Sequence, residues 1–426
     1  MISELLRRDR ELLWHPYASM SEPPPVLPVR EAHGCRIVLE DGRELLDALS
    51  SWWCVCHGHN HPAIVEAVRK QAEKLHQVMF AGFTHEPAVE LAELLTRRTP
   101  PGLNKVFFAD SGSVTVECAA KLAVQYQMAG KRPARKRLLA LRGGYHGDTS
   151  GAMALSDPGG MHKMFAGLLA EHFFAPRPAV AFDEAWRGDG AADLAEMIER
   201  HHDESAALIL EPVFQGANAI RFYHPQYLNE ARRLCSRYDI LLIFDEIATG
   251  CGRLGKFFAA DFAGVAPDIM CVGKGLTGGA ITLGALIASE TVAEVVSAGT
   301  PGVFLHGPTF MANPLACAAG CASQKLFDVY DWQGCVGRIE RQLRDELAPG
   351  RKLANVREVR VLGAVGVLEL VRMPTVEQVF AAVGKHRVWL RPFGNWLYTM
   401  PPFVMTPGEL SQVTAAMLDL AEIAGR

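Results

Sequence analysis

The sequence predicts an α/β protein in which a large domain with a mostly parallel sheet is joined to a smaller α+β domain. Three observations predict this fold. The 426 residues exceed the roughly 250 to 300 at which one hydrophobic core stops growing. Between residues 103 and 290, short apolar runs alternate with longer helical patterns, as in a parallel sheet covered on both faces. Both chain ends mix short extended stretches with helices.

Six apolar runs in the central region have the length of buried strands. Turn residues follow each run, and strands buried on both faces are continuous in their hydrophobicity. The predicted strands are residues 105–109, 137–141, 207–210, 240–244, 268–272 and 283–288. We expect them to form one doubly wound core.

The two chain ends together supply the smaller domain. Residues 26–49 hold extended stretches broken at Gly34 and at Asp41-Gly42, which indicates a hairpin. The chain from residue 324 is mainly helical, gives strand candidates at 356–371 and 388–390, and closes with a helix from Pro407. The predicted division is therefore residues 1–50 and 326–426 for the small domain, and 51–325 for the large one.

Composition excludes several classes of function. The chain has 43 Lys and Arg against 47 Asp and Glu, a net charge of -4, so it lacks the basic surface that a nucleic acid demands. With 49% hydrophobic and 21% charged residues it is an ordinary globular sequence. The charged N-terminus does not resemble an export signal, and no apolar run approaches the roughly 20 residues that cross a bilayer. We expect a cytoplasmic protein.

The ten cysteines are scattered, which favours reduced and mostly buried thiols. One cluster needs separate consideration, because Cys54, Cys56, His57, His59 and His61 lie within eight residues. No second pair of ligands with zinc-site spacing follows it. The sequence therefore predicts a loop that enters a helix near Pro62, and no metal site.

Two reactive side chains follow neighbouring strands of the predicted sheet. Asp245 directly follows the run 240–244, and Lys274 follows the run 268–272 between Gly273 and Gly275. In open parallel sheets ligands gather at the carboxyl ends of strands. A carboxylate there can keep a ring nitrogen protonated, and a desolvated lysine amine can form an imine. Separately, each is as easily a loop residue; together they indicate a site for pyridoxal phosphate (PLP).

A phosphate-binding cup and an aromatic wall are also indicated. Gly112 and Ser113 open a helix after the run 105–109, where free N–H groups and the helix dipole favour an anion. The alternative is a simple helix cap. Tyr145 follows the run 137–141 among glycines that would let its ring lie over a planar cofactor, unless it is a core tyrosine. The glycine pattern around it does not match a dinucleotide site.

Taken together, these residues resemble the class III aminotransferases of fold type I, over nearly the whole chain. Residues 242–256 (LIFDEIATGCGRLGK) and 267–279 (PDIMCVGKGLTGG) carry the most specific likeness. The resemblance implies a seven-stranded sheet, PLP as cofactor, Asp245 at its pyridine nitrogen and Lys274 as its Schiff-base partner. Cys251 departs from the bulkier residue usual in the family, outside the catalytic positions.

Further segments resemble the branch of this class that serves biotin synthesis. They are residues 14–17, 50–53, 306–314 and 391–398. That branch makes 7,8-diaminononanoate from 8-amino-7-oxononanoate with S-adenosylmethionine as amino donor. The resemblance implies a homodimer in which Pro308 and Thr309 complete the phosphate site of the neighbouring subunit. It also implies substrate contacts from Tyr17, Trp52, Tyr145, Lys274, Gly307 and Arg391, of which Arg391 would bind a carboxylate.

The chemistry of the keto substrate agrees with these contacts, because a long aliphatic chain ending in a carboxylate suits an aromatic wall and one guanidinium. The alternative for Arg391 is a surface ion pair. On an extended segment adjacent residues point opposite ways, so we expect only one of Trp52 and Trp53 to face the pocket. Arg253 and Asp148 are further candidate contacts. The chain departs from its relatives at Thr115, Cys118 and residues 218–220, which could tune specificity.

The sequence leaves other interpretations of the function open. The nearest is another class III ω-amino acid or diamine transaminase that uses pyruvate or 2-oxoglutarate, and lysine could replace S-adenosylmethionine as donor. A noncatalytic binding protein with this fold is disfavoured by an intact Lys274 and Asp245. A nicotinamide oxidoreductase is disfavoured because the first strand lacks the glycine fingerprint.

Overall fold

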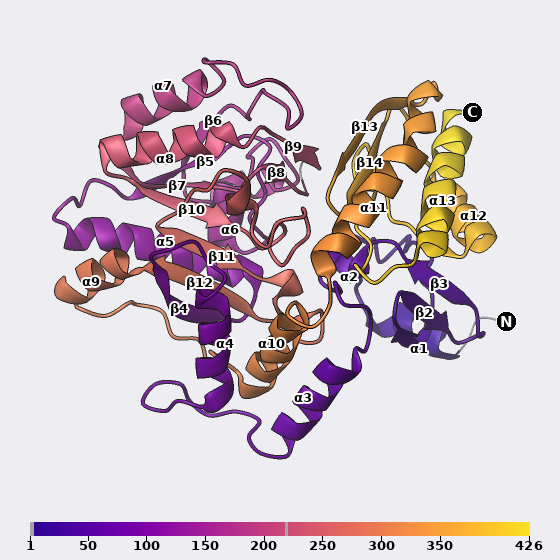
Figure 1. Cartoon of the computed structure of the whole chain (residues 1–426), viewed down its shortest axis with the longest axis horizontal. Coiled ribbons are helices and arrows are strands. Elements are labelled where there is room, and N and C mark those ends of the chain that lie inside the picture. Colours follow the sequence, from indigo (N-terminus) through magenta and orange to yellow (C-terminus); the bar gives the residue numbers. More distant parts are fainter. Residues whose placement is uncertain (1–3, 218–219) are drawn as a thin grey trace.

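A seven-stranded, mostly parallel sheet forms the centre of the larger lobe, as the sequence predicts (Figure 1). The computed structural model describes residues 4–217 and 220–426; the departure noted at Asn218 and Ala219 lies outside them. The strands stand in the order β4-β12-β11-β10-β7-β5-β6, with β12 antiparallel to both neighbours. Their bounds are β4 Leu103–Ala109, β5 Arg137–Leu141, β6 Phe173–Ala175, β7 Ser205–Leu210, β10 Leu241–Asp245, β11 Ile269–Val272 and β12 Gly284–Ser289.

All six predicted strands are present, and their observed ends differ from the predicted ones by at most two residues. The seventh, β6, was missed because it is a three-residue edge strand, too short to produce a periodic pattern. A further short hairpin, β8 (Phe214–Gln215) with β9 (Arg221–Phe222), follows β7.

Helices cover both faces of the central sheet, because alternate strand residues point to opposite sides. One face packs on α5 (Gly112–Ala129), α6 (Ser150–Leu155) and α9 (Glu290–Ala298) through residues such as Ile209 and Ile243. The other face packs on a larger core through residues such as Leu208 and Phe244. Its helices are α4 (Glu86–Thr96), α7 (Ala192–His201), α8 (Gln226–Tyr238) and α10 (Pro314–Leu326).

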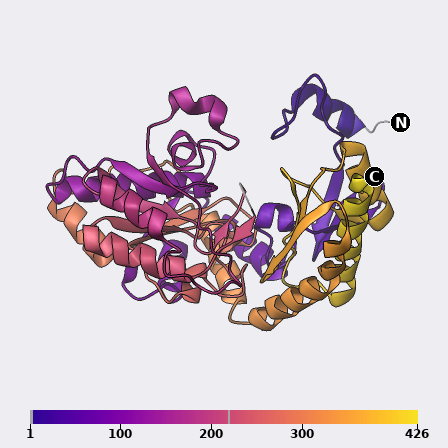
Figure 2. The same cartoon turned by 90° about the horizontal axis from the view of Figure 1, so that it is seen from above.

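The smaller lobe combines the two chain ends (Figures 1 and 2). Its first sheet has the order β1-β2-β3-β15, in which β15 from the C-terminal part runs parallel to β3. Its second sheet has the order β13-β14-β16. The strands are β1 Val29–His33, β2 Arg36–Leu39, β3 Glu44–Asp47, β13 Val356–Leu362, β14 Val365–Leu370, β15 Val388–Trp389 and β16 Trp396–Thr399. The exact domain boundaries at residues 50 and 325 stay a prediction.

The remaining helices connect or flank the two lobes. They are α1 Glu4–Leu12, α2 Ser50–Trp53, α3 Pro62–Ala72, α11 Trp332–Leu347, α12 Val376–His386 and α13 Pro407–Gly425, with short 3-10 turns η1 Lys163–Leu168, η2 Ala259–Phe262, η3 Lys274–Thr277 and η4 Ala348–Lys352. The predicted helix starts at Pro62 and Pro407 are both observed, each with proline in the first turn. Helix α1 stands away from the rest of the chain in Figure 2 and buries no residue. In the described ranges no helix combines the length and hydrophobicity of a membrane span.

Candidate active site

Two cavities meet at Lys274. The smaller, of about 210 Å³, is lined by Ser111, Gly112, Ser113, His146, Glu211 and Asp245 among others, and is called the inner cavity here. The larger, of about 780 Å³, is lined by Tyr17, Trp52, Asp148, His162, Arg391 and Phe393 among others, and is called the outer cavity. Lys274, Trp53 and Tyr145 line both. The lysine amine is therefore accessible from a polar chamber on one side and a largely aromatic one on the other.

Asp245 and Lys274 converge because β10 and β11 are parallel neighbours. Asp245 is the last residue of β10 and lies opposite Cys271, three residues before Lys274. Its carboxylate is 3% exposed and accepts a hydrogen bond from the Ile247 N–H at 3.1 Å, while Oδ2 lies 2.7 Å from His146 Nδ1. The ends of these two neighbouring strands thus bring the two predicted side chains to one cavity.

The environment of Lys274 favours a reactive amine. Its backbone lies in the left-handed region, with φ of 43°, and its Nζ is 4.9 Å from the centroid of the Trp53 ring. Burial lowers the pKa of the Lys274 amine below its ordinary value, and the charges of Asp245 and Glu211 counteract part of that shift. An amine with a lowered pKa has a larger neutral fraction, which is the nucleophilic form.

The beginning of α5 forms one wall of the inner cavity. Ser111 is the N-cap, and its Oγ accepts a hydrogen bond from the Val114 N–H at 3.3 Å. The next two residues, Gly112 and Ser113, present first-turn N–H groups that helices leave without intrahelical partners. A Cβ at Gly112 would lie 2.9 Å from Ile247 Cγ2, so the close approach of these segments needs glycine. This wall suits a phosphate group.

The sequence interpretation missed two polar residues of the inner cavity, Glu211 and His146. The Glu211 carboxylate accepts hydrogen bonds from the N–H groups of Tyr145 at 3.0 Å and Gly216 at 2.9 Å. Burial raises its pKa to about 7. For His146, burial lowers the pKa, but the hydrogen bond and charge of Asp245 outweigh it and the net pKa is raised. Glu211 directly follows β7, so the strand-end rule could have found it.

Asp148 organises one side of the outer cavity. Its carboxylate accepts hydrogen bonds from Tyr17 Oη at 3.2 Å and Tyr145 Oη at 2.9 Å, and it lies 3.0 Å from His162 Nε2. Burial, followed by the charge of Asp148, raises the pKa of both tyrosines, so both stay protonated donors at neutral pH. The structure places the predicted residues Tyr17 and Tyr145 together here, and His162 is an addition to them.

Arg391 lies against aromatic rings on another side of the outer cavity. Its guanidinium carbon is 4.8 Å from the Trp52 ring centroid and 5.9 Å from that of Tyr17. Among the residues that the structure describes, no carboxylate lies within 4.0 Å of it. The alternative of a surface ion pair is therefore not realised in this chain, and the guanidinium donors remain available to a ligand.

The expectation that only one of Trp52 and Trp53 faces the pocket is wrong. Both line the outer cavity, because Ser50–Trp53 is a left-handed turn and not an extended segment. The left-handed conformation costs each residue other than glycine roughly 1–2 kcal/mol. Serine and tryptophan therefore do not favour it, and the sequence contains no indication of this turn. The turn places two adjacent indoles on one side of the chain.

Arg253 does not contribute to either cavity, which corrects the expectation that it contacts substrate. It is 2% exposed, donates to the Pro401 carbonyl at 2.7 Å, and stacks on Phe403 at 4.8 Å. Gly307, Pro308 and Thr309 also line neither cavity of this chain. Within the described ranges, no three His, Cys, Asp or Glu side chains are placed to hold a metal ion.

The donor set of the inner cavity fits PLP. The start of α5 offers N–H groups for a phosphate, Asp245 offers a carboxylate for a ring nitrogen, and Lys274 offers an amine for an aldehyde. Gly147 allows the tight packing behind this wall, since a Cβ there would lie 2.2 Å from Ser113 Oγ. The phosphate, the ring nitrogen and the aldehyde of the cofactor therefore each have a chemical partner in one cavity.

Comparisons with known proteins agree with this geometry. The model of the family described as aminotransferase class-III matches residues 17–420. A protein from Mycobacterium leprae (strain TN), named adenosylmethionine-8-amino-7-oxononanoate aminotransferase, is 47% identical over 425 residues, covering 98% of this chain and 96% of its own. A protein of the same name from Saccharomyces cerevisiae is 41% identical over 463 residues, with coverage of 98% and 96%.

Two solved structures share the fold over nearly the full length. The adenosylmethionine-8-amino-7-oxononanoate aminotransferase from Methanocaldococcus jannaschii superposes with a TM-score of 0.92 at 30% identity, covering 99% of each chain. An amine transaminase from an uncultivated Pseudomonas species, in its PLP-bound form, gives a TM-score of 0.87 at 32% identity, covering 97% of this chain and 99% of that one. The likeness thus extends to transaminases with different names.

Proposed function

From the premise that the chain belongs to the class III aminotransferases, which use PLP, we propose that it transfers the amino group of S-adenosylmethionine to 8-amino-7-oxononanoate. The product would be 7,8-diaminononanoate, an intermediate of biotin synthesis. The names of relatives 41–47% identical over nearly the whole chain support this substrate pair. A cytoplasmic location is part of the same proposal.

The observation that carries the proposal is the outer cavity itself. It has a volume of about 780 Å³ and aromatic walls, with Lys274 at one side and an unpaired Arg391 guanidinium at another among the described residues. An ω-carboxylate on an aliphatic chain needs such a combination of apolar wall and bidentate donor. Asp148, in the same cavity, supplies negative charge for the amino group that both substrates carry.

The roles proposed for the chain's residues follow from their positions. When bound, PLP supplies a pyridinium ring that stores the electron pair released at the substrate carbon. Asp245, backed by His146, would keep the ring nitrogen protonated, and the α5 wall at Gly112 and Ser113 would hold the phosphate. The Lys274 amine would bind the cofactor covalently and move a proton to and from the substrate carbon.

Half-reaction spectroscopy tests the donor. Holoenzyme is mixed with S-adenosylmethionine alone, and loss of the visible cofactor absorbance band is followed. Rapid loss, reversed by 8-amino-7-oxononanoate, is the expected result. A response to alanine, glutamate, lysine or a diamine, with none to S-adenosylmethionine, would overturn the proposed substrates while leaving the aminotransferase family intact.

One observation keeps a second candidate function in view. The likeness to the Pseudomonas amine transaminase is as high in identity as the likeness to the Methanocaldococcus structure, 32% against 30%. A class III ω-amino acid or diamine transaminase that uses pyruvate or 2-oxoglutarate is therefore the alternative. A diamine carries no carboxylate, so its half-reaction would be insensitive to loss of Arg391, whereas an ω-amino acid would still need that contact.

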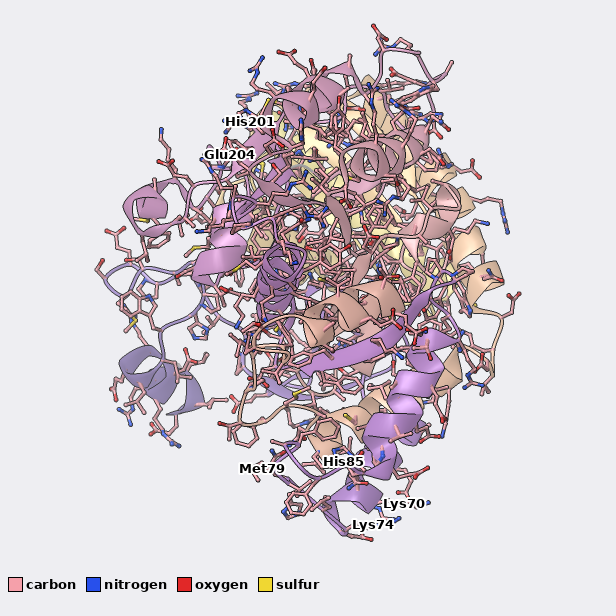
Figure 3. All side chains as sticks on the ribbon, turned by 90° about the vertical axis from the view of Figure 1, so that its left-hand side faces the viewer. Lys70, Lys74, Met79, His85, His201 and Glu204 are labelled. Carbon is pink, nitrogen blue, oxygen red and sulfur yellow. The ribbon has the colours of Figure 1, made fainter. Side chains whose placement is uncertain are left out.

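A homodimer with shared phosphate sites is also part of the proposal. The connection between α3 and α4 holds the segment 299–313: Gln77 Nε2 donates to the Thr309 carbonyl at 2.8 Å, and His85 Nε2 lies 2.7 Å from the Ala312 carbonyl. Around this contact Met79 is 61% and Phe310 is 59% exposed. Figure 3 shows Met79 and His85 at one end of the molecule. Apolar side chains around Thr309 suit burial against a second copy.

The dimer is tested by mass and by cofactor affinity. Light scattering should give twice the chain mass, and Thr309→Ala should weaken cofactor binding without dissociating the dimer. A native monomer that binds PLP tightly would reject the shared site.

A further inference from the structure

The segment that carries Trp52 has an unusual backbone. All four residues of α2, Ser50–Trp53, have positive φ, with values of 46°, 46°, 65° and 76°, and none is glycine. L-residues avoid this region, so consecutive left-handed residues persist only where the surrounding structure fixes them. Some group outside the turn must therefore hold it in place.

Asp47, three residues before the turn, holds it through hydrogen bonds of its side chain. Its side chain is fully buried. Oδ1 accepts a hydrogen bond from the Leu49 N–H at 3.0 Å, and Oδ2 accepts one from Ser51 Oγ at 2.8 Å. The same Oδ2 lies 2.9 Å from His59 Nε2, which anchors the carboxylate from outside the turn. One buried carboxylate thus fixes both the entry to the turn and its second residue.

The strand that ends at Asp47 also sets the position of Arg391. β3 runs parallel to β15, and Asp47 stands opposite Trp389, two residues before Arg391. The turn and the arginine therefore leave the same strand pair in the same direction. They meet again at the outer cavity, where the Arg391 guanidinium carbon lies 4.8 Å from the Trp52 ring centroid.

We propose that Asp47 is a positioning residue for the recognition of an aliphatic carboxylate. By fixing the left-handed turn, it sets the Trp52 ring against the Arg391 guanidinium and keeps this arginine aimed into the outer cavity. The inference deepens the proposed function, since it rests on a carboxylate-bearing substrate at Arg391. Asp47 itself lines neither cavity, so it acts through Trp52.

Other hydrogen bonds also hold the turn to the smaller lobe. Ser50 Oγ donates to the Met400 carbonyl at 2.7 Å, and Thr399 Oγ1 donates to the Ala48 carbonyl at 2.7 Å. These bonds would remain if Asp47 were replaced. A loss of Asp47 would therefore loosen the turn while the lobe stays attached at Met400.

The test is a double-mutant cycle on the holoenzyme with nonanoate as the probe, an aliphatic carboxylate that cannot react. Its dissociation constant is measured by calorimetry for the native protein, Asp47→Ala, Trp52→Ala and the double variant. Asp41→Ala, an exposed aspartate in the β2–β3 turn, is the matched control. Each of the two single variants should weaken nonanoate binding about tenfold. The double variant should bind nonanoate no more weakly than the single variant that binds it least. Asp41→Ala should bind like the native protein.

Ser51→Ala covers the case in which Asp47→Ala does not fold, since it removes only the 2.8 Å bond to Asp47. It should raise KM for the keto substrate about threefold and leave kcat and the cofactor absorbance unchanged.

The inference would be overturned if Asp47→Ala bound nonanoate like the native protein, or if the losses in the double variant were additive. It would also be overturned if Ser51→Ala lowered kcat about threefold, or if the native protein did not bind nonanoate. Failure of the proposed function is a separate result: no product from S-adenosylmethionine and 8-amino-7-oxononanoate, with nonanoate binding still dependent on Asp47.

Discussion

The inner and outer cavities share Lys274 but are built in different ways. Apart from Trp53, the inner cavity is assembled at the carboxyl edge of one sheet, from residues that end or follow β4, β5, β7, β10 and β11. The outer cavity takes Tyr17 and Arg391 from the two chain ends and Trp52 from the turn that follows β3. Its polar residues Tyr145, Asp148, His162 and Lys274 come from the central lobe. One depends on a single regular sheet, and the other on the docking of distant segments.

This difference separates chemistry from specificity. A rigid sheet edge can hold Asp245, Lys274 and the α5 start in a fixed relation, which acid–base and covalent chemistry require. Loops and chain ends can change without disturbing that relation. The inner cavity should therefore determine whether any amino group is transferred, and the outer cavity should determine whose.

The largest effect is expected from Lys274→Ala, which removes the reactive amine that lines both cavities. Turnover should fall by at least about 1000-fold with every donor, because the variant loses both the covalent link and the proton carrier. The visible absorbance of the bound cofactor should shift as well. Lys256→Ala, an exposed lysine, is the control. Retention of both activity and spectrum would remove Lys274 from the chemistry.

Asp245→Asn tests the inner cavity without touching the outer one. The amide is nearly isosteric but neutral, so the ring nitrogen would lose its charged partner. We expect kcat to fall about 100-fold for both half-reactions, with KM for each substrate within a few-fold of the native value. Steady-state kinetics and the cofactor spectrum measure this, with exposed Asp203→Asn as control. A change confined to KM would contradict the division of roles.

Arg391→Ala tests the outer cavity in the same manner. Loss of a charge-assisted carboxylate contact costs about 1.5 kcal/mol, so KM for 8-amino-7-oxononanoate should rise about tenfold with little change in kcat. Arg387→Ala, an exposed arginine four residues earlier, is the control. If kcat fell as far as in Asp245→Asn, the outer cavity would take part in the chemistry and the comparison would fail.

The same difference explains what the sequence could predict. Asp245 and Lys274 follow buried strands, and the rule that ligands gather at strand ends needs only local patterns. Gly112 and Ser113 were found in the same way, from a strand followed by a helix start. Glu211 obeys the rule too, because it directly follows β7, although the sequence interpretation missed it.

The residues of the outer cavity could not be predicted from local sequence patterns, because they come from distant parts of the chain. The left-handed turn at Trp52 and Trp53 has no propensity signal, since neither serine nor tryptophan favours positive φ. Arg253 was expected to contact substrate, yet its side chain donates to the Pro401 carbonyl in the smaller lobe. Tyr17 and Arg391 were named only through family resemblance, and spacing alone could not have joined them.

The smallest effect concerns the protonation of Glu211, which belongs to the inner cavity alone. Burial raises its pKa from 4.5 to about 7, so the folded protein binds this proton more tightly than the unfolded chain. Its contribution to stability is complete below 4.5 and is lost as pH rises through about 7, at up to about 1.4 kcal/mol per pH unit. Glu211→Gln cannot titrate and should lack this slope.

Urea unfolding of cofactor-free protein at pH 5.5 and pH 7.5 measures the effect. Other buried groups titrate in the same range: burial raises the pKa of Glu246 to about 7 and lowers the pKa of His57 to about 3 and of His172 to about 4. Because both proteins contain these groups, the difference between them isolates Glu211: between the two pH values the native protein should lose more stability than Glu211→Gln, by up to about 1.4 kcal/mol per pH unit. An unchanged pH dependence would mean that Glu211 is already ionised in the folded state. The inner cavity would then carry a second negative charge beside Asp245, and the pKa of Lys274 would lie closer to its ordinary value than burial alone implies.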